Sequence, residues 1–341
     1  MKYVGLDVHK NQTAVCVLDE NGKKVMARTV RGGAAEVVGV LRKIKEPFAV
    51  CFEASTGYGH WHDALAPLAR RIVVVHPGHV RLIFHSKRKN DRIDAHKLAT
   101  LLFLGEIPSV HVPGADVRGW RSLIEFRRRS VADRTRTKNR LRALLRGLGI
   151  RARYRLWTKA GRAWLAELDL PTDEQALQRD LLLDEVIHAD RKIKRIERQL
   201  AVRADGHPGV TLLRTIPGVG PRTAEALVAY IDDPRRFGRN KAIGAYFGLV
   251  PSLDASANVA RYGHITREGP ATARHYLVEA AWQGVRHSPR IKAFYERIKK
   301  DNPERRKIAL VATAHYLARV MLAMLTSGET WWPEGGAALA A

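Results

Sequence analysis

Residues 1 to about 105 alternate between short apolar runs and amphipathic stretches, and this alternation constrains the fold more than any other feature. Apolar runs at 3–8, 13–18 and 24–30 predict three consecutive strands, with Asn21-Gly22 as a hairpin turn. Helical spacing at 34–45, 61–68 and 91–104 then alternates with strand-like runs at 48–52 and 72–75. This order predicts a mixed sheet with helices on its faces. In the helix at 91–104 we expect Ile93, Leu98, Leu101 and Leu102 to face inward.

The composition changes after this region, at a Pro- and Gly-containing segment, 106–115, which we interpret as a linker. Between residues 118 and 162 there are 16 Arg or Lys and two acids, Glu125 and Asp133. Apolar residues run through it at helical intervals, and a second helical pattern at 173–204 has Leu177, Leu181, Val186, Ile193, Ile196 and Leu200 as its apolar face. We predict a helical hairpin or coiled coil with a strongly basic first arm.

The basic arm favours contact with nucleic acid, since a face with few acids repels itself unless a polyanion neutralises it. A solvated basic face is the alternative. The predicted contacts come from one run of cations, which are Arg127, Arg128, Arg129, Arg134, Arg136, Lys138, Arg140 and Arg142.

A mostly helical region begins near Gly209. It contains Ile216-Pro217-Gly218-Val219-Gly220, which resembles the hairpin of helix-hairpin-helix modules, so Gly218 and Gly220 are further candidates for phosphate contact. The alternative is a Gly-rich turn between packed helices. The apolar stretch at 308–326 includes His315 and Arg319, and we expect a core helix rather than a membrane span. The predicted domains are 1–110, 111–206 and 207–330, followed by a flexible tail at 331–341.

The net charge is +25, from 59 Lys and Arg against 34 Asp and Glu, which predicts an anionic partner. The two cysteines, Cys16 and Cys51, exclude a disulfide scaffold and a four-cysteine zinc site, and we expect both to be buried. The N-terminus shows no signal peptide. Together these features predict a cytoplasmic protein with a nucleic-acid partner and no membrane partner.

Four acids stand at positions that suggest a metal site. Asp7 lies inside the first strand, where Asp is uncommon, and Glu53 directly follows the fourth strand. Asp91 and Asp94 are three residues apart at the start of a helix, so both point to one side. In one small domain such carboxylates would bind two Mg²⁺ ions that hold a scissile phosphate.

The order and spacing of these acids resemble the RNase H-like nuclease fold in its RuvC-like form. The motifs Gly5-Leu6-Asp7-Val8-His9-Lys10, Lys89-Asn90-Asp91-Arg92-Ile93-Asp94 and Gly248-Leu249-Val250-Pro251-Ser252 widen the resemblance. So do Gly263-His264-Ile265-Thr266-Arg267-Glu268-Gly269, and Arg274 with the residues after it. They resemble the insertion-sequence DEDD transposases, some of which are known as bridge-RNA-guided recombinases. The likeness spans roughly residues 3–326.

This resemblance implies a DNA transposase, a site-specific recombinase that acts on donor and target DNA in bacteria or archaea. It implies that Asp7, Glu53, Asp91 and Asp94 bind Mg²⁺, two ions per site, and that Ser256 forms a phosphoserine link to DNA. It further implies a noncoding guide RNA and a homo-oligomer, a dimer or tetramer. The chain departs from the family pattern at Ala257, where Gly is usual, and at Pro270, where Asn is usual.

Two alternatives remain open at this point. The first is a metal-dependent junction resolvase in which water attacks and Ser256 is incidental. The second is a non-catalytic RNA-binding or architectural protein. Ser55 and Ser252 are other serines near the motifs. His9, two residues after Asp7, is a candidate to lie near the site, but we favour a solvated turn histidine.

Overall fold

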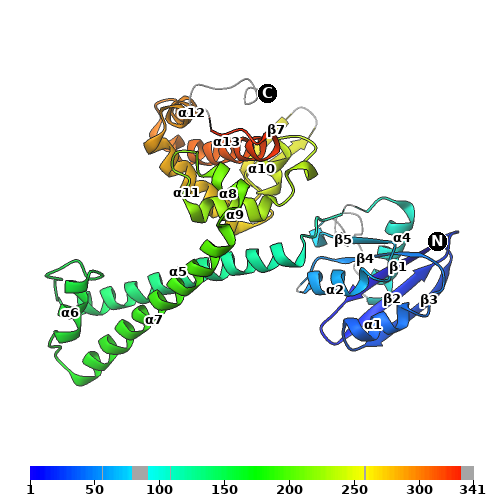
Figure 1. Ribbon diagram of the computed structural model, residues 1–341, viewed down its shortest axis with the longest axis horizontal. Helices are drawn as coiled ribbons and strands as arrows, with labels where there is room; N and C mark the ends of the chain where they lie inside the picture. The colour runs from blue at the N-terminus through cyan, green and yellow to red at the C-terminus, as the bar shows by residue number, and fades with distance from the viewer. Residues whose placement is uncertain (56, 79–90, 108, 257–258, 332–341) are drawn as a thin grey trace. The chain divides into compact units, whose positions relative to one another are not determined.

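The predicted N-terminal strands form one five-stranded sheet in the first of two compact units, Met1–Arg118 and Gly119–Ala341 (Figure 1). The structure is a computed structural model. It describes residues 1–55, 57–78, 91–107, 109–256 and 259–331, with only the backbone for 254–256 and 259–260. Each unit is described below by itself.

The sheet of the first unit has the strand order β3-β2-β1-β4-β5. Strands β1 (Lys2–Val8), β2 (Gln12–Leu18) and β3 (Lys24–Arg31) form an antiparallel meander. Strands β4 (Phe48–Glu53) and β5 (Arg71–Val75) extend it in parallel with β1. The mixed α/β fold is therefore confirmed, and its strand order is compatible with an RNase H-like domain.

Helices cover both faces of this sheet, as strands that are buried on both sides require. Helices α1 (Ala34–Leu41) and α2 (Tyr58–Leu65) pack on one face, where Val4, Leu6 and Trp61 share a core. Helix α4 (Asp91–Leu104) covers the other face. Cys16 and Cys51 are buried on that second face, and both are free, as predicted.

Helix α4 lies unusually close to β1 because small residues meet there. A Cβ atom on Gly5 would overlap the carbonyl oxygen of Ala95 and lie 2.5 Å from the backbone nitrogen of Ala99. Ala95 and Ala99 are fully buried, whereas Ile93 is 42% exposed. Our prediction that Ile93 faces inward was wrong, because the alanines rather than the large apolar residues make the closest contact.

We expect Gly5→Ala to lower the free energy of unfolding by about 2–3 kcal/mol, since the new methyl group must displace the backbone of α4. Gly39→Ala is the matched control, because Gly39 lies in α1 with open space around its Cα. That change should be neutral or stabilise the protein by about 0.5–1 kcal/mol. Urea unfolding of the two variants checks the difference, and equal stabilities would contradict the packing argument.

The segment at 106–115, which we interpreted as a linker, adds to the edge of the sheet. The Val110 N–H donates to the Val74 carbonyl at 2.7 Å, and Ser109 forms an antiparallel bridge with Val75. Ile107 is buried. Pro108 lies outside the described residues. The chain therefore runs along β5 before it enters the next helix.

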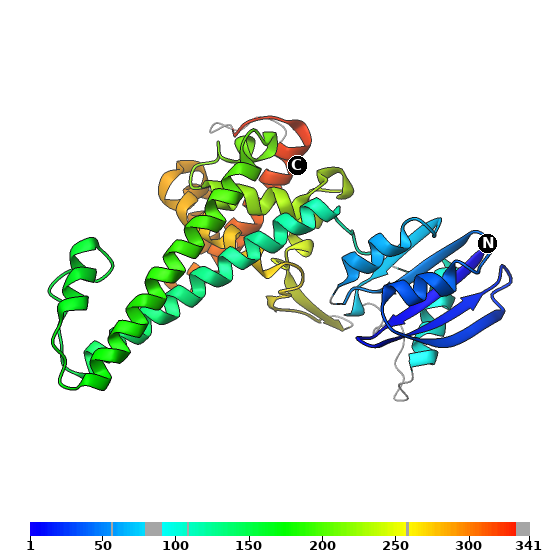
Figure 2. The same cartoon turned by 60° about the horizontal axis from the view of Figure 1, so that its bottom comes forward.

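Two long helices form an antiparallel hairpin at the start of the second unit, and Figures 1 and 2 show them side by side. They are α5 (Ala115–Gly147), which begins in the first unit, and α7 (Asp173–Ala204), with the short α6 (Lys159–Glu167) between them. Residues 127, 134 and 137 of α5 contact residues 197, 190 and 185 of α7 respectively. The residue numbers fall along α7 as they rise along α5, so the two helices are antiparallel. The helical hairpin was predicted, and its first long helix ends at Gly147.

The predicted apolar face of α7 is correct only in part. Val186, Ile193, Ile196 and Leu200 are buried. Leu177 and Leu181 are 60% and 57% exposed, and the neighbouring leucines at 182 and 183 are buried in their place. The prediction failed for these two leucines because helical spacing alone does not fix which stripe meets α6 and α5.

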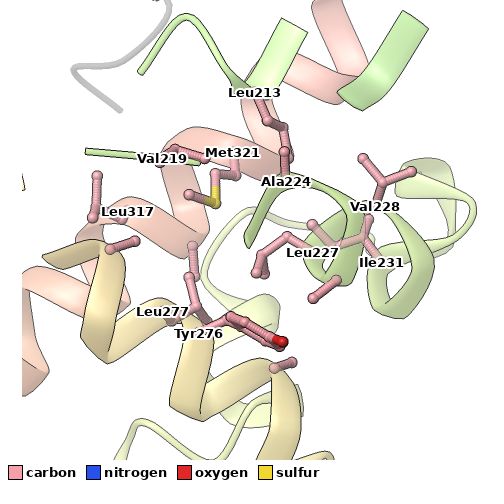
Figure 3. Packing of buried hydrophobic residues seen from close by; sticks show 14 of the residues in the cluster. Leu213, Val219, Ala224, Leu227, Val228, Ile231, Tyr276, Leu277, Leu317 and Met321 are labelled. Atoms are coloured by element: carbon pink, nitrogen blue, oxygen red, sulfur yellow. The ribbon is translucent and has the colours of Figure 1, made fainter. Parts of the chain in front are cut away.

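The remaining elements of the second unit surround a large apolar core (Figure 3). They are α8 (Pro208–Leu213), α9 (Pro221–Ile231), η1 (Pro234–Arg236), α10 (Ala242–Tyr246), the hairpin β6 (Pro251–Ser256) and β7 (Val259–Ile265), α11 (Ala271–His287), α12 (Pro289–Lys299), η2 (Pro303–Arg305) and α13 (Arg306–Ser327). Trp331, which we assigned to a flexible tail, is 7% exposed and belongs to this core. The rest of that tail lies outside the described residues.

The segment Pro303–Ser327 is long and apolar enough to cross a membrane, but α13 packs inside the second unit. Leu317 and Met321 are fully buried and face Leu277 and Val219 in the core (Figure 3). Half of its most apolar window is buried. The structure agrees with the predicted core helix.

A carboxylate is buried in α9 without a matching hydrogen bond. Glu225 is fully buried, and neither of its carboxylate oxygens accepts a hydrogen bond from a described residue. The guanidinium of Arg222 lies 2.7 Å from Glu225 Oε1, yet burial outweighs this favourable charge and raises the pKa of Glu225 to about 7.

The raised pKa makes the stability of this unit depend on pH. The folded protein holds the Glu225 proton more tightly than the unfolded chain does. The stabilisation from this bound proton is therefore complete below about pH 4.5 and is lost as the pH rises to about 7. We expect Glu225→Gln to remove this loss and to be about 1–3 kcal/mol more stable than the wild type at pH 8. Urea unfolding at pH 5 and pH 8 measures it. A constant stability difference between the two pH values would contradict the assignment.

Candidate active site

Asp7 and Glu53 lie at the carboxyl ends of two neighbouring parallel strands. The register pairs Gly5 with Cys51 and Leu6 with Phe52, so the next positions along β1 and β4 are Asp7 and Glu53. Side chains alternate between faces along a strand, so Asp7 and Glu53 share the face of Gly5 and Cys51, which α4 covers. The Asp7 side chain is 19% exposed.

Asp91 and Asp94 occupy the first turn of α4, as the sequence predicted. The Lys97 ammonium donates to Asp94 Oδ1 at 3.0 Å. The close approach of α4 to β1 at Gly5 brings this turn toward the end of β1. Lys89 and Asn90, which belong to the same motif, lie outside the described residues.

Two further side chains connect β1, β2 and α4. His9 Nε2 lies 3.2 Å from Asp7 Oδ2 and 3.5 Å from Asp91 Oδ1. The Gln12 amide donates to Asp91 Oδ2 at 3.2 Å. The His9 side chain is 48% exposed, as expected for a solvated turn residue, and it also lies beside the acids, which was the alternative. Sequence reasoning missed Gln12, but its position two residues before Ala14, on the α4 face of β2, was a usable signal.

These groups have the arrangement of a cation site. Asp7, His9 and Asp91 each offer a ligand atom, and the three atoms lie within 4.8 Å of one another. Burial raises the pKa of Asp7, hydrogen bonding and charge from His9 oppose this, and the charges of Asp91 and Asp94 raise it further. A bound cation would relieve both the burial cost and the repulsion.

The structure thus gathers the four predicted acids at one end of the sheet. Asp7 and Asp91 are linked through His9, Asp94 acts electrostatically on Asp7, and Glu53 ends the strand beside Asp7. Oxygen donors from β1, β4 and α4 can hold divalent cations and position a phosphate.

Ser256 occupies a different element, the β6–β7 hairpin of the second unit. It is the last residue of β6 and pairs with Val259, so residues 257 and 258 connect the two strands. The Ser256 side chain and Ala257 lie outside the described part of the structure. Ser55 and Ser252 are both exposed.

The base of this hairpin is fixed by two glycines and one arginine. Gly248 and Gly269 have φ of +61° and +69°, and a Cβ on either would overlap a backbone oxygen, of Glu268 or Tyr246 respectively. The Arg274 guanidinium donates to the carbonyls of Phe247 at 2.8 Å and Glu268 at 2.9 Å. These residues hold together the loops before β6 and after β7.

Two family models match the chain. One, described as a transposase and built on DEDD transposases of the IS110 type, matches residues 4–150, which include the four acids. The other, described as the transposase IS116/IS110/IS902 family, matches residues 210–296, which include the serine hairpin. The chain belongs to the IS110 family of DEDD transposases. It is accordingly a DNA transposase, an enzyme that acts on DNA.

Relatives of the IS110-family chain align along most of its length. The transposase for insertion sequence element IS1111A of Coxiella burnetii is 28% identical, over 97% of this chain and 91% of that protein. A probable family 20 transposase of Pseudomonas aeruginosa is 28% identical, over 97% and 98%. A putative transposase of Sinorhizobium fredii, y4qE, is 29% identical, over 93% and 80%.

The basic run that we predicted to bind nucleic acid is largely paired within this transposase. All of its predicted cations except Arg140 contact an acid or an aromatic ring. The contacts are Arg127 with Glu197, Arg128 and Arg129 with Glu125, Arg134 with Asp190, Arg136 with Asp133, and Lys138 and Arg142 with the Trp157 ring. Helix α5 itself carries few acids, and α7 supplies Glu197 and Asp190 as further partners. Arg129, Arg136, Arg140 and Arg142 are still exposed.

The Gly-rich turn of the transposase has a packing role at its first glycine. Gly218 has φ of +89°, and a Cβ there would lie 2.6 Å from the backbone nitrogen of Gly284 in α11. Gly220, by contrast, has open space around it and caps the N-terminus of α9. The turn between packed helices therefore explains Gly218, and only Gly220 is open to a phosphate.

We expect Arg274→Ala to destabilise the transposase by about 2–3 kcal/mol, since the Phe247 and Glu268 carbonyls lose a charged donor. Arg274→Lys should recover part of this loss, because an ammonium can donate to one or both carbonyls with poorer geometry. Urea unfolding gives the order wild type, Lys, Ala. An alanine variant as stable as the wild type would contradict a structural role for Arg274.

Proposed function

We propose that the chain mobilises its insertion sequence as a site-specific recombinase, through a covalent phosphoserine intermediate and under the direction of a noncoding RNA. The observation that carries the proposal is the gathering of Asp7, Glu53, Asp91 and Asp94 at one end of a sheet with RNase H-like strand order. Acids at the ends of β1 and β4 and on the helix after β5 support the RuvC-like form of that fold. The localisation that suits this reaction is the cytoplasm.

The donor set fits Mg²⁺, proposed as two ions per site. Carboxylate oxygens are the ligands that Mg²⁺ prefers, and the desolvated Asp7 beside Asp91 and Asp94 is stabilised by added positive charge. When bound, the ions would neutralise negative charge on the scissile phosphate and stabilise the charge that develops on the attacking oxygen. His9 and Gln12 orient the oxygens of Asp7 and Asp91, and Lys97 holds Asp94.

Ser256 is the proposed nucleophile, by its match to the family's C-terminal motif. Its oxygen would bond to phosphorus while the bond from phosphorus to a deoxyribose oxygen breaks, and the leaving oxygen takes up the proton that serine loses. A hydroxyl of the other DNA would then attack phosphorus and release the serine. The phosphodiester is conserved at each step, so no nucleotide cofactor is consumed. Its place beside a two-residue connection favours access by a strand of DNA.

The proposed partners are donor DNA, target DNA and a guide RNA. A net charge of +25 suits backbone binding, which by itself carries no sequence information. Base pairing with an RNA would supply that information. The acids lie in the first unit and Ser256 in the second, and a dimer or tetramer is proposed to bring both to one phosphodiester, from one protomer or from two.

The expected product of the reaction is a covalent adduct between protein and DNA. Wild-type protein, purified with its RNA, is incubated with Mg²⁺ and plasmid DNA that carries the element's ends, and adducts are detected by denaturing electrophoresis. We expect Asp7→Asn and Ser256→Ala to reduce the adduct at least about 100-fold, since each removes a group needed for the bond to form. Ser252→Ala is the matched serine control and should leave the adduct unchanged.

Two further arms separate the parts of the proposal. Chelation of Mg²⁺ should abolish the adduct, and ribonuclease treatment before DNA is added should abolish it if an RNA guides the protein. Strand cleavage with no adduct would instead indicate hydrolysis by water, as in a junction resolvase. An adduct that persists in Ser256→Ala would contradict the assignment of the nucleophile.

A further inference from the structure

Between residues 185 and 198, the acids and the arginines of α7 make different contacts. Its acids Glu185, Asp190 and Glu197 contact α5, where they accept hydrogen bonds from Thr137, Arg134 and Arg127 respectively. The cations between them point elsewhere. The sequence shows mixed charges on α7, and the structure leaves Arg191, Arg195 and Arg198 exposed to solvent.

These cations line a groove of about 890 Å³ along α7, beside α5. Its basic lining is His188, Arg191, Lys192, Arg195 and Arg198, and no acid is among the residues that line it in the described part of the chain. Arg191, Arg195 and Arg198 are exposed, and no described acid forms an ion pair with any of them. The groove therefore presents uncompensated positive charge.

An aromatic ring from α5 borders the same groove. Phe126 is 49% exposed, and the Lys192 ammonium lies 5.5 Å from the centroid of its ring. Leu123 and Ile196 supply apolar surface beneath. An exposed aromatic ring among cations that pair with no described acid is the combination that binds an unpaired nucleotide, with its base stacked and its phosphate neutralised.

The spacing of the arginines also fits a single strand. Residues 191 and 198 are about 10 Å apart along a helix that rises 1.5 Å per residue. An arginine at every third or fourth residue gives this side of α7 a row of positive charge that can follow a phosphate backbone. A second copy of the chain suits the groove poorly, since it would bring a molecule of net charge +25 against the same cations.

We propose that this groove binds an unpaired segment of nucleic acid, with a base stacked on Phe126 and phosphates at Arg191, Arg195 and Arg198. The inference rests on the proposed function, which supplies RNA and separated DNA strands as sources of such a segment. It assigns single-strand binding to α7 and α5 together, in addition to the predicted basic face of α5.

The test uses full-length protein stripped of nucleic acid at high salt, and an oligonucleotide of about twelve residues with a central 2-aminopurine. Stacking on Phe126 quenches the fluorescence of that base. We expect Phe126→Leu, which keeps apolar bulk without an aromatic face, to weaken single-strand binding at least about 5-fold and to remove the quenching. Phe126→Trp should restore both, and the affinity for a blunt duplex should not change.

The charges are tested by the salt dependence of binding. Arg191→Gln, Arg195→Gln and Arg198→Gln together should lower the slope of log affinity against log salt by about 2, as expected for three phosphates. A matched triple variant, Lys292→Gln, Arg306→Gln and Lys307→Gln, loses the same charge at exposed positions and should lower it by less than about 1.

Quenching that survives Phe126→Leu, or equal slopes in the two triple variants, would overturn the proposal. So would a change from dimer to monomer in Phe126→Leu with quenching intact, which would assign the groove to a second copy. Binding of RNA and of DNA with the same sequence is also compared. Tighter binding of RNA identifies the guide as the ligand, whereas equal binding fits RNA and DNA alike. Both results support nucleic-acid binding in the groove. The assay needs neither Mg²⁺ nor Ser256, so a failed adduct reaction with normal quenching contradicts only the proposed function.

Discussion

The contact between α4 and β1 at Gly5 is the constraint on which the candidate active site depends. Because Gly5 has no side chain, the backbone of α4 at Ala95 and Ala99 lies directly on the strand. The first turn of α4 is thereby fixed one helical turn from this contact, and β1 reaches Asp7 two residues beyond it. A larger residue at position 5 would move the helix and separate Asp91 from Asp7, which His9 now links. The glycine and two alanines therefore set the spacing of the acids without being part of the site.

A second set of contacts, between α5 and α7, decides where positive charge is available in the other unit. Arg127 and Arg134 meet Glu197 and Asp190 across the helical hairpin, and these pairs are partly buried. An arginine in such a pair is costly to withdraw, because its partner would be left desolvated and unneutralised. A phosphate therefore competes poorly for these arginines. Among the described residues, no acid pairs with Arg191, Arg195 or Arg198, which are exposed along the groove.

Local patterns predicted the strands and most helices, because buried strands are continuous apolar runs and helix α7 has clear caps and spacing. The same patterns placed the four acids, since each is defined by its position in one element. Contacts between distant elements were not predictable in this way. His9 meets Asp91 only after α4 folds over the sheet, and Arg134 meets Asp190 only after the hairpin closes. Ile93 and Leu177 were misassigned for the same reason, since the packing partner and not the apolar character selects the buried stripe.

The choice of donors around Asp7 and Asp91 bears on what these acids can bind. A lysine or arginine paired with Asp7 would offset its burial cost, but it would also occupy the oxygens and repel a cation. Instead, His9 contacts Asp7 Oδ2 and Gln12 donates to Asp91 Oδ2, each through a hydrogen bond of 3.2 Å that a divalent cation can replace at lower cost. The raised pKa of Asp7 shows that the offset is incomplete. In a chain with so many more cations than acids, Asp7 and Asp91, held by these weak donors, suit the proposed cation site better than a role in stabilising the fold.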